Sequence, residues 1–82
     1  MYNLEWKEHA QRNIEGLDEA TAKRILKKIE ELPENPFSKD IKRLKGSNDF
    51  RLRVGDYRIM FSIEKNIITI LKIGHRKNIY DR

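Results

Sequence analysis

Arginine side chains on either side of a glycine–aspartate pair are the residues of this chain best suited to chemistry. Arg51 and Arg53 alternate with apolar residues before Gly55-Asp56, and Arg58 follows the pair two positions later. A guanidinium group binds phosphate through paired N–H donors and stays positively charged at neutral pH. The sequence therefore predicts a site for a phosphate-containing ligand.

A second set of such residues lies near the C-terminus. Arg76 adds another guanidinium, and Tyr80 adds a phenol that can stack on a nucleic-acid base or transfer a proton. His75 lies beside Gly74 in a strand pattern, which indicates a packing or turn residue rather than an acid–base group. The predicted site thus consists of arginines and one tyrosine.

The spacing around Gly55-Asp56 predicts a β-hairpin that brings the arginines together. Apolar and polar residues alternate on both sides of the pair, which suits a two-residue type II′ turn. That turn places Arg53 opposite Arg58, and Arg51 opposite Met60, on the face away from the core. Like charges that face each other destabilise a sheet by roughly 0.2–1 kcal/mol. Because stability does not favour this arrangement, we interpret it as functional.

The position of Lys72 depends on the next turn, near residues 64–66. A three-residue loop puts Lys72 beside Arg58, whereas a two-residue loop puts it on the opposite face of the sheet. The spacing leaves both arrangements open.

The remaining pattern predicts the elements that support this hairpin. Residues 2–6 alternate as a half-buried strand does, and residues 7–15 have the apolar spacing of a helix that ends at Gly16. Asp18 is a favourable N-cap for a second helix, which ends at Pro33. Phe37 is expected to fill the core, residues 38–49 form a polar connection, and three strands follow. The predicted class is α+β, ordered β-α-α-β-β-β, with an N-terminal helical hairpin packed on a mostly antiparallel four-stranded sheet.

Length and composition limit what the chain can be. With 82 residues it can form one core, so we expect a single domain over residues 1–82. It has no cysteine and two histidines, which excludes disulfides and cysteine-type zinc sites, and no metal or cofactor is predicted. The longest apolar run, residues 67–71, is too short to cross a membrane. No signal peptide is visible, so a cytoplasmic location is expected.

The excess positive charge lies entirely in the second half. Residues 1–38 carry six basic and eight acidic side chains, a net charge of −2, whereas residues 39–82 carry twelve and five, a net charge of +7. Such asymmetry indicates a polyanionic partner such as nucleic acid. The basic group of the second helix, in contrast, is balanced by nearby glutamates and is predicted to be a solvated surface; it comprises Lys23, Arg24, Lys27 and Lys28.

As a whole, the chain resembles the RelE/ParE superfamily of toxin–antitoxin toxins, and the RelE branch in particular. The resemblance runs from Tyr2 to Tyr80 and is carried by an ordered set of motifs: Leu-Pro-Glu-Asn-Pro-Phe at 32–37, Arg-Leu-Lys-Gly at 43–46, the hairpin at 50–61, Ile-Gly-His-Arg at 73–76 and Ile-Tyr at 79–80. It implies a small sheet flanked by two N-terminal helices, in agreement with the predicted order.

The resemblance also implies an activity. RelE-like toxins cleave mRNA in the ribosomal A site, with the 2′-hydroxyl as nucleophile and without a metal, and a cognate antitoxin neutralises them. By this resemblance Arg58 and Arg76 stabilise the phosphate, and Tyr80 stacks on the base or transfers a proton. Arg51 and Arg53 stand where some members have lysines. Because arginine is a poor general base, Tyr80 is the expected proton acceptor, with His75 a distant second.

The partners implied are the antitoxin, the ribosome with its rRNA, and mRNA, without a membrane. Further basic residues are predicted to contact RNA or the ribosome: Lys39, Lys42, Arg43, Lys45, Lys72 and Lys77. Two alternatives remain. One is a ParE-like toxin that inhibits DNA gyrase by binding, and the other is a non-catalytic RNA-binding or degenerate toxin module. The arginine set together with Tyr80 favours the nuclease.

Overall fold

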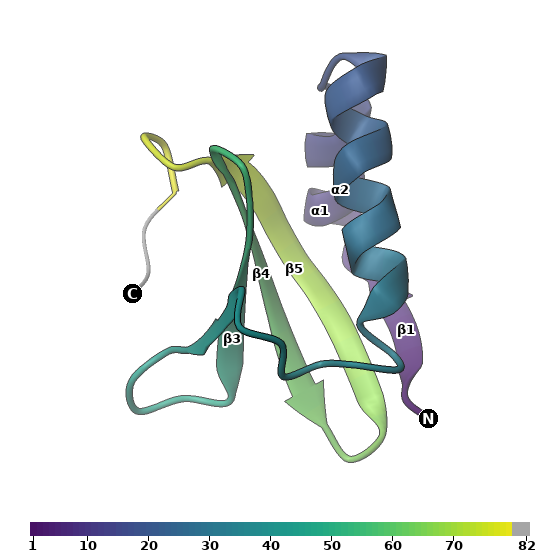
Figure 1. Cartoon of the computed structure of the whole chain (residues 1–82), viewed down its shortest axis with the longest axis vertical. Coiled ribbons are helices and arrows are strands. Elements are labelled where there is room, and N and C mark those ends of the chain that lie inside the picture. The colour runs from purple at the N-terminus through teal and green to yellow at the C-terminus, as the bar shows by residue number, and fades with distance from the viewer. Residues whose placement is uncertain (80–82) are drawn as a thin grey trace.

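Two helices cover one face of a five-stranded sheet in the computed structural model, which describes residues 1–79 (Figure 1). The elements follow in the order β1 (Asn3–Trp6), α1 (Glu8–Glu15), α2 (Glu19–Glu31), β2 (Ile41–Arg43), β3 (Asp49–Val54), β4 (Tyr57–Glu64) and β5 (Ile67–His75). The predicted α+β class and helical hairpin are confirmed. In the described part of the chain, neither helix is long and apolar enough to span a bilayer.

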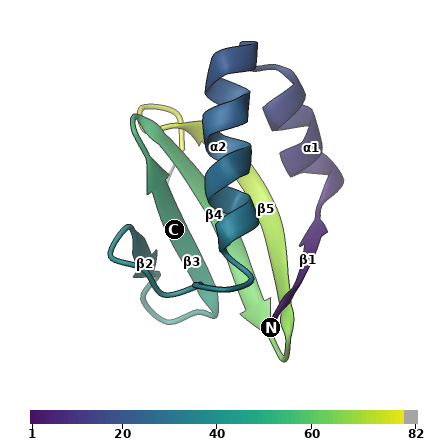
Figure 2. The ribbon, with the colours of Figure 1, turned by 45° about the vertical axis from the view of Figure 1, so that its right-hand side comes forward.

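The strands lie in the order β1-β5-β4-β3-β2, with β1 parallel to β5 and the other neighbours antiparallel. The prediction of four strands is wrong, because β2 forms within the segment expected to be a polar connection. Ile41 of β2 pairs with Leu52 of β3, at the outer edge of the sheet (Figure 2). Since β2 has one apolar residue in three, its extended conformation depends on the edge of β3 that it pairs with.

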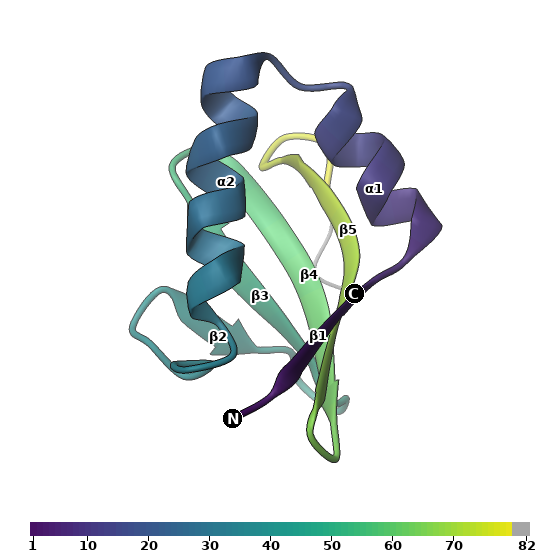
Figure 3. The ribbon, with the colours of Figure 1, turned by 90° about the vertical axis from the view of Figure 1, so that its right-hand side faces the viewer.

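α1 begins at Glu8, one residue later than predicted, and ends before Gly16 as predicted. α2 begins after its N-cap Asp18 and ends before Pro33, also as predicted. Both helices pack on the same face of the sheet (Figure 3). The Asp18 carboxylate accepts a hydrogen bond of 3.1 Å from the Thr21 N–H, one of the donors that a helix start leaves unpaired. The same interaction lowers the pKa of Asp18. Ile25 and Ile29 of α2 are fully buried against the sheet.

The core fills the space between these helices and the sheet, and it does not include Phe37. The Phe37 side chain is 63% exposed, so the prediction that it fills the core is wrong. Its ring contacts the edge of Phe50 with 5.9 Å between centroids, and Pro36 is the buried residue of that turn. Phe37 therefore lies at the margin of the core.

α1 covers the part of one β5 edge that β1 does not pair with. β1 pairs with β5 only as far as Trp6 and Ile70, so the next stretch of β5 has no neighbouring strand on that edge. There Asn13 of α1 accepts a hydrogen bond of 2.9 Å from the Ile73 N–H. A polar residue in a short helix thus satisfies a strand donor that would otherwise lack a partner.

Candidate nucleic-acid interface

The β3–β4 hairpin has the register that the sequence predicts. Gly55 and Asp56 form the turn, and Gly55 has a φ of +58°, as the first central residue of a type II′ turn requires. Arg53 pairs with Arg58, and Arg51 pairs with Met60. We call the sheet face that carries these residues, and that no helix covers, the open face.

Lys72 joins the open face by a route that neither loop alternative included. The turn before β5 has two residues, since Glu64 pairs with Ile67, and such a turn would by itself put Lys72 on the helix side. A register shift between Met60 and Phe61 reverses this, because it pairs Lys72 with Met60. Lys72 therefore lies in the row of Arg51, and Gly74 is the residue opposite Arg58.

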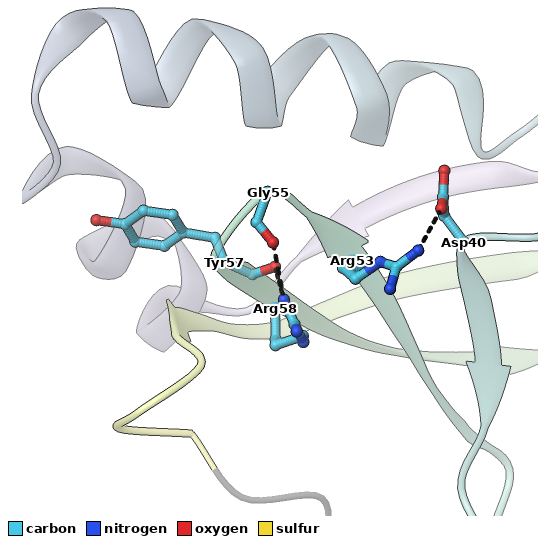
Figure 4. Close-up of polar contacts among 5 residues, drawn as sticks. All are labelled: Asp40, Arg53, Gly55, Tyr57 and Arg58. Carbon is cyan, nitrogen blue, oxygen red and sulfur yellow. Dashed lines mark hydrogen bonds and ion pairs between the residues drawn. The ribbon is translucent and has the colours of Figure 1, made fainter.

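Arg58 is held in a bent conformation at the hairpin turn. Its Nη1 donates hydrogen bonds of 3.0 Å to the carbonyl oxygens of both Gly55 and Tyr57, while the Tyr57 ring extends away from the guanidinium (Figure 4). These two bonds use the two hydrogens of Nη1, so Nε and Nη2 form the edge of the guanidinium that can bind phosphate in a bidentate manner.

The open face concentrates positive charge around Arg58. Partial burial lowers the pKa of Arg58, and the charges of Arg51, Arg53 and Arg76 lower it further, while Asp56 opposes them. A guanidinium keeps its proton at neutral pH even so. We call Arg51, Arg53, Arg58 and Arg76 the arginine cluster. Their positive charges repel one another, and binding of an anion would relieve that repulsion.

Arg53 forms an ion pair with a carboxylate that was not among the predicted site residues. Its Nη2 lies 3.3 Å from Oδ1 of Asp40. Both residues line a hollow of about 270 Å³ beside β2, together with Lys39, Ile41, Lys42 and Arg51. Asp40 is the one acidic residue between Lys39 and Lys45, and this isolated carboxylate in a basic segment was the available signal.

The C-terminal segment brings Arg76 to the same region. The Arg76 N–H donates a hydrogen bond of 2.8 Å to the Asp56 carbonyl, and its Nε lies 3.7 Å from the Asp56 carboxylate. Ile79 packs over Gly74 on the open face, where an added Cβ would lie 3.5 Å from the Ile79 Cβ. Tyr80, the predicted proton acceptor, lies outside the described residues.

Other predicted residues are not part of the cluster. Arg43 lies on the side opposite Lys42 and Arg51, and its Nε donates to the Ser47 carbonyl at 3.1 Å. His75 pairs with Tyr57 on the helix side, with the rings edge to face at 5.4 Å, and its Nδ1 accepts a hydrogen bond from the Lys77 N–H. His75 is thus a packing and turn residue, as expected. The side chains of Lys45 and Lys77 are exposed on turns.

A further arginine approaches the hairpin from the helix side. The Arg24 Nη2 lies so close to Gly55 that a Cβ there would be 2.7 Å from it. The sequence predicted that Arg24 lies on a solvated helix surface, because its contact with the hairpin turn is not visible in the local pattern. Among residues 1–79, no three His, Cys, Asp or Glu side chains are grouped as a metal site would need.

Comparison with known proteins identifies the family. Residues 4–80 match the family model described as the ParE toxin of the type II toxin-antitoxin system parDE. The chain belongs to the RelE/ParE toxin superfamily. The resemblance predicted from the motifs is therefore confirmed.

Within the superfamily, several of the relatives found are named RelE. Toxin RelE3 of Methanocaldococcus jannaschii is 44% identical over 48 residues, which are 57% of this chain and 54% of that protein, so the match spans about half of RelE3. A chain of the RelB-RelE antitoxin-toxin complex from Methanococcus jannaschii is 31% identical, with a TM-score of 0.78 and coverage of 94% of this chain and 95% of that one. The archaeal RelE-RelB complex from Pyrococcus horikoshii OT3 contains a chain with 26% identity, a TM-score of 0.82 and coverage of 95% and 98%.

Proposed function

We propose that this chain is a RelE-like toxin that acts in the cytoplasm as a ribosome-dependent endoribonuclease and is neutralised by a cognate antitoxin. One observation carries the proposal: Arg51, Arg53, Arg58 and Arg76 converge on one sheet face closely enough for their charges to act on Arg58. The occurrence of two relatives in RelB–RelE complexes supports the antitoxin as partner.

In the proposed reaction, the 2′-oxygen of a nucleotide bonds to the adjacent phosphorus and the bond from phosphorus to the 5′-oxygen breaks. The products are a 2′,3′-cyclic phosphate and a 5′-hydroxyl. Negative charge develops on the pentacoordinate phosphate, and the Nε–Nη2 edge of Arg58, with Arg76, stabilises it. Arginine cannot accept the proton of the 2′-hydroxyl, so we assign that step to the phenolate of Tyr80, and the 5′-oxygen takes a proton from water.

This protein supplies charge rather than a complete acid–base pair. The scarcity of acid–base groups around these arginines in residues 1–79 suits a reaction in which the ribosome positions the substrate. Such positioning can supply much of the rate enhancement, because it converts a flexible mRNA into a near-reactive conformation.

The test is cleavage of mRNA on programmed ribosomes, with the 5′ ends of the fragments mapped. We expect cuts in the A-site codon with the wild-type chain, and a fall in rate of about 10²-fold or more for Arg58→Ala and for Arg76→Ala. Arg12→Ala is the matched control, since Arg12 lies on α1 and pairs with Glu8 at 3.2 Å. Undiminished cleavage by both Arg58→Ala and Arg76→Ala would disprove the site.

A ParE-like toxin is the second candidate, because the family model that matches residues 4–80 is that of the ParE toxin. This candidate predicts inhibition of DNA gyrase while mRNA on ribosomes stays intact. Supercoiling by purified gyrase, measured with equal amounts of the same toxin preparation, separates the two functions.

A further inference from the structure

A groove separates α2 from the end of β3, on the opposite side of the hairpin turn from the open face. It encloses about 510 Å³ and is lined by four cations and two carboxylates: Arg24, Lys27, Lys28, Arg53, Glu31 and Asp40. We call it the α2–β3 groove. β2 leaves it accessible, because β2 pairs with β3 only as far as Leu52.

Two guanidinium groups meet at Gly55 from opposite sides of the sheet. Arg58 donates a hydrogen bond of 3.0 Å to the Gly55 carbonyl from the open face. Arg24 reaches the same glycine from α2, where its Nη2 occupies the space that a Cβ would need. The hairpin turn therefore joins the groove to the arginine cluster.

The groove and the open face also share residues. Arg53 and Asp40 line the α2–β3 groove, and both line the hollow beside β2 that contains Lys42 and Arg51. A basic surface thus continues around the sheet edge, from α2 past Arg53 to the open face. A polyanion longer than one phosphate could follow it.

Two cations of the groove lack a compensating carboxylate. Lys28 pairs with Glu31 at 3.9 Å, and Arg53 pairs with Asp40 at 3.3 Å. For Arg24 and Lys27, no ion pair forms within residues 1–79. They lie one turn apart on α2, where neighbouring positive charges repel each other.

We infer that the α2–β3 groove binds backbone phosphates of the same RNA strand whose cleavable phosphate lies on the open face, with Arg24 and Lys27 each contacting one of them. The inference rests on the proposed function for the identity of the polyanion. An acidic protein segment is the less favoured occupant, because protein interfaces depend on apolar or aromatic anchors and, within residues 1–79, Val54 is the only apolar side chain lining this groove. Guanidinium and ammonium groups bind phosphate directly, through charge and hydrogen bonds.

The experiment measures binding of a fluorescent single-stranded RNA of about 12 nucleotides to the full chain over a range of salt concentrations. Each phosphate contact with single-stranded nucleic acid contributes about 0.7 to the slope of log K against log salt. We expect Arg24→Gln and Lys27→Gln each to reduce that slope by about 0.7, and the double variant by about 1.4. The matched control is Lys23→Gln, because Lys23 lies on the same helix, pairs with Glu19 at 3.6 Å and does not line the groove.

An unchanged slope and affinity in the double variant would overturn the inference. So would a variant that binds RNA normally but is no longer neutralised by the antitoxin, since the groove would then belong to the protein partner. Lys27→Gln keeps the test valid if Arg24→Gln alters the hairpin turn, because no hydrogen bond or ion pair joins Lys27 to that turn within residues 1–79. The binding assay does not require cleavage. If the variants reduce the slope while the wild-type chain leaves mRNA on ribosomes uncut, phosphate binding in the groove is supported and the proposed nuclease function is wrong.

Discussion

Arg53 and Arg58 lie directly opposite each other in the β3–β4 ladder, on the sheet face that no helix covers. Each has its own compensation: Arg53 has the Asp40 carboxylate, and Arg58 has the carbonyl oxygens of Gly55 and Tyr57. The hairpin therefore tolerates a repulsive pair that an anionic ligand can use. The same arrangement makes Asp40 a competitor of RNA phosphate for Arg53.

This competition predicts opposite effects of Asp40→Asn on stability and on binding. Loss of the carboxylate should lower the free energy of unfolding by up to about 1 kcal/mol, the range for a partly exposed ion pair. The same variant should bind single-stranded RNA more tightly, because Arg53 then loses the Asp40 carboxylate that competes with phosphate. Urea denaturation and fluorescence anisotropy measure the two effects.

Glu30→Gln is the control for Asp40→Asn. It removes one negative charge from the exposed side of α2, where Glu30 has no ion pair within the described residues. If Glu30→Gln raises RNA affinity as much as Asp40→Asn does, net charge explains the gain, and the proposed competition for Arg53 is wrong.

The hairpin could be predicted from sequence because its determinants are local. Gly55-Asp56 specifies a two-residue turn, and a two-residue turn determines every pair along β3 and β4. The Arg53–Arg58 pair follows from the length of this turn alone. The motif at residues 50–61 also carries much of the family resemblance, so the fold and the arginine cluster were predicted together.

Features that depend on distant contacts could not be predicted in this way. β2 has too few apolar residues to be distinguished from a loop, and only its pairing with β3 makes it a strand. The register shift between Met60 and Phe61 has no local sequence signal, yet it decides the face of Lys72. The local pattern predicts a solvated helix surface for Arg24, and only the packing of α2 beside Gly55 shows its contact with the hairpin turn.

The Asn13–Ile73 hydrogen bond predicts a specific loss of stability. Asn13→Ala leaves the partly buried Ile73 N–H without its acceptor and should lower the free energy of unfolding by about 1–3 kcal/mol. Asn13→Asp retains an acceptor oxygen at the same position, so it should be less destabilising at neutral pH. Urea denaturation of the two variants checks this. Equal losses would mean that α1 covers the β5 edge by packing alone.

The N-cap of α2 predicts a dependence on pH. Hydrogen bonding from Thr21 lowers the pKa of folded Asp18 below its ordinary value of 3.8, so this interaction stabilises the protein above that pH. The stabilisation is lost as the pH falls through the folded-state pKa. We therefore expect wild type to melt at a higher temperature than Asp18→Ala at pH 7, with a difference that shrinks in strong acid. Asp18→Asn keeps a capping oxygen without the charge, so its melting temperature relative to Asp18→Ala should not show this loss.

Gly55→Ala tests whether Arg24 binds RNA from its position at the hairpin turn. The φ of +58° disfavours alanine by roughly 1–2 kcal/mol, and the new Cβ would lie 2.7 Å from the Arg24 Nη2. Because that atom ends a flexible side chain, the guanidinium should move away rather than the backbone. Gly46→Ala is the control for the backbone effect, since Gly46 has a φ of +76° and no atom within 4 Å of an added Cβ.

We expect both alanine variants to lose similar stability in urea denaturation, while only Gly55→Ala weakens RNA binding. Its salt-dependence slope should fall by about 0.7, although no charge has been removed. In an Arg24→Gln background, Gly55→Ala should have no further effect on that slope, because the contact that it displaces is already absent. A further fall in the double variant would show that Gly55→Ala acts through Arg58, whose Nη1 donates to the Gly55 carbonyl, rather than through Arg24.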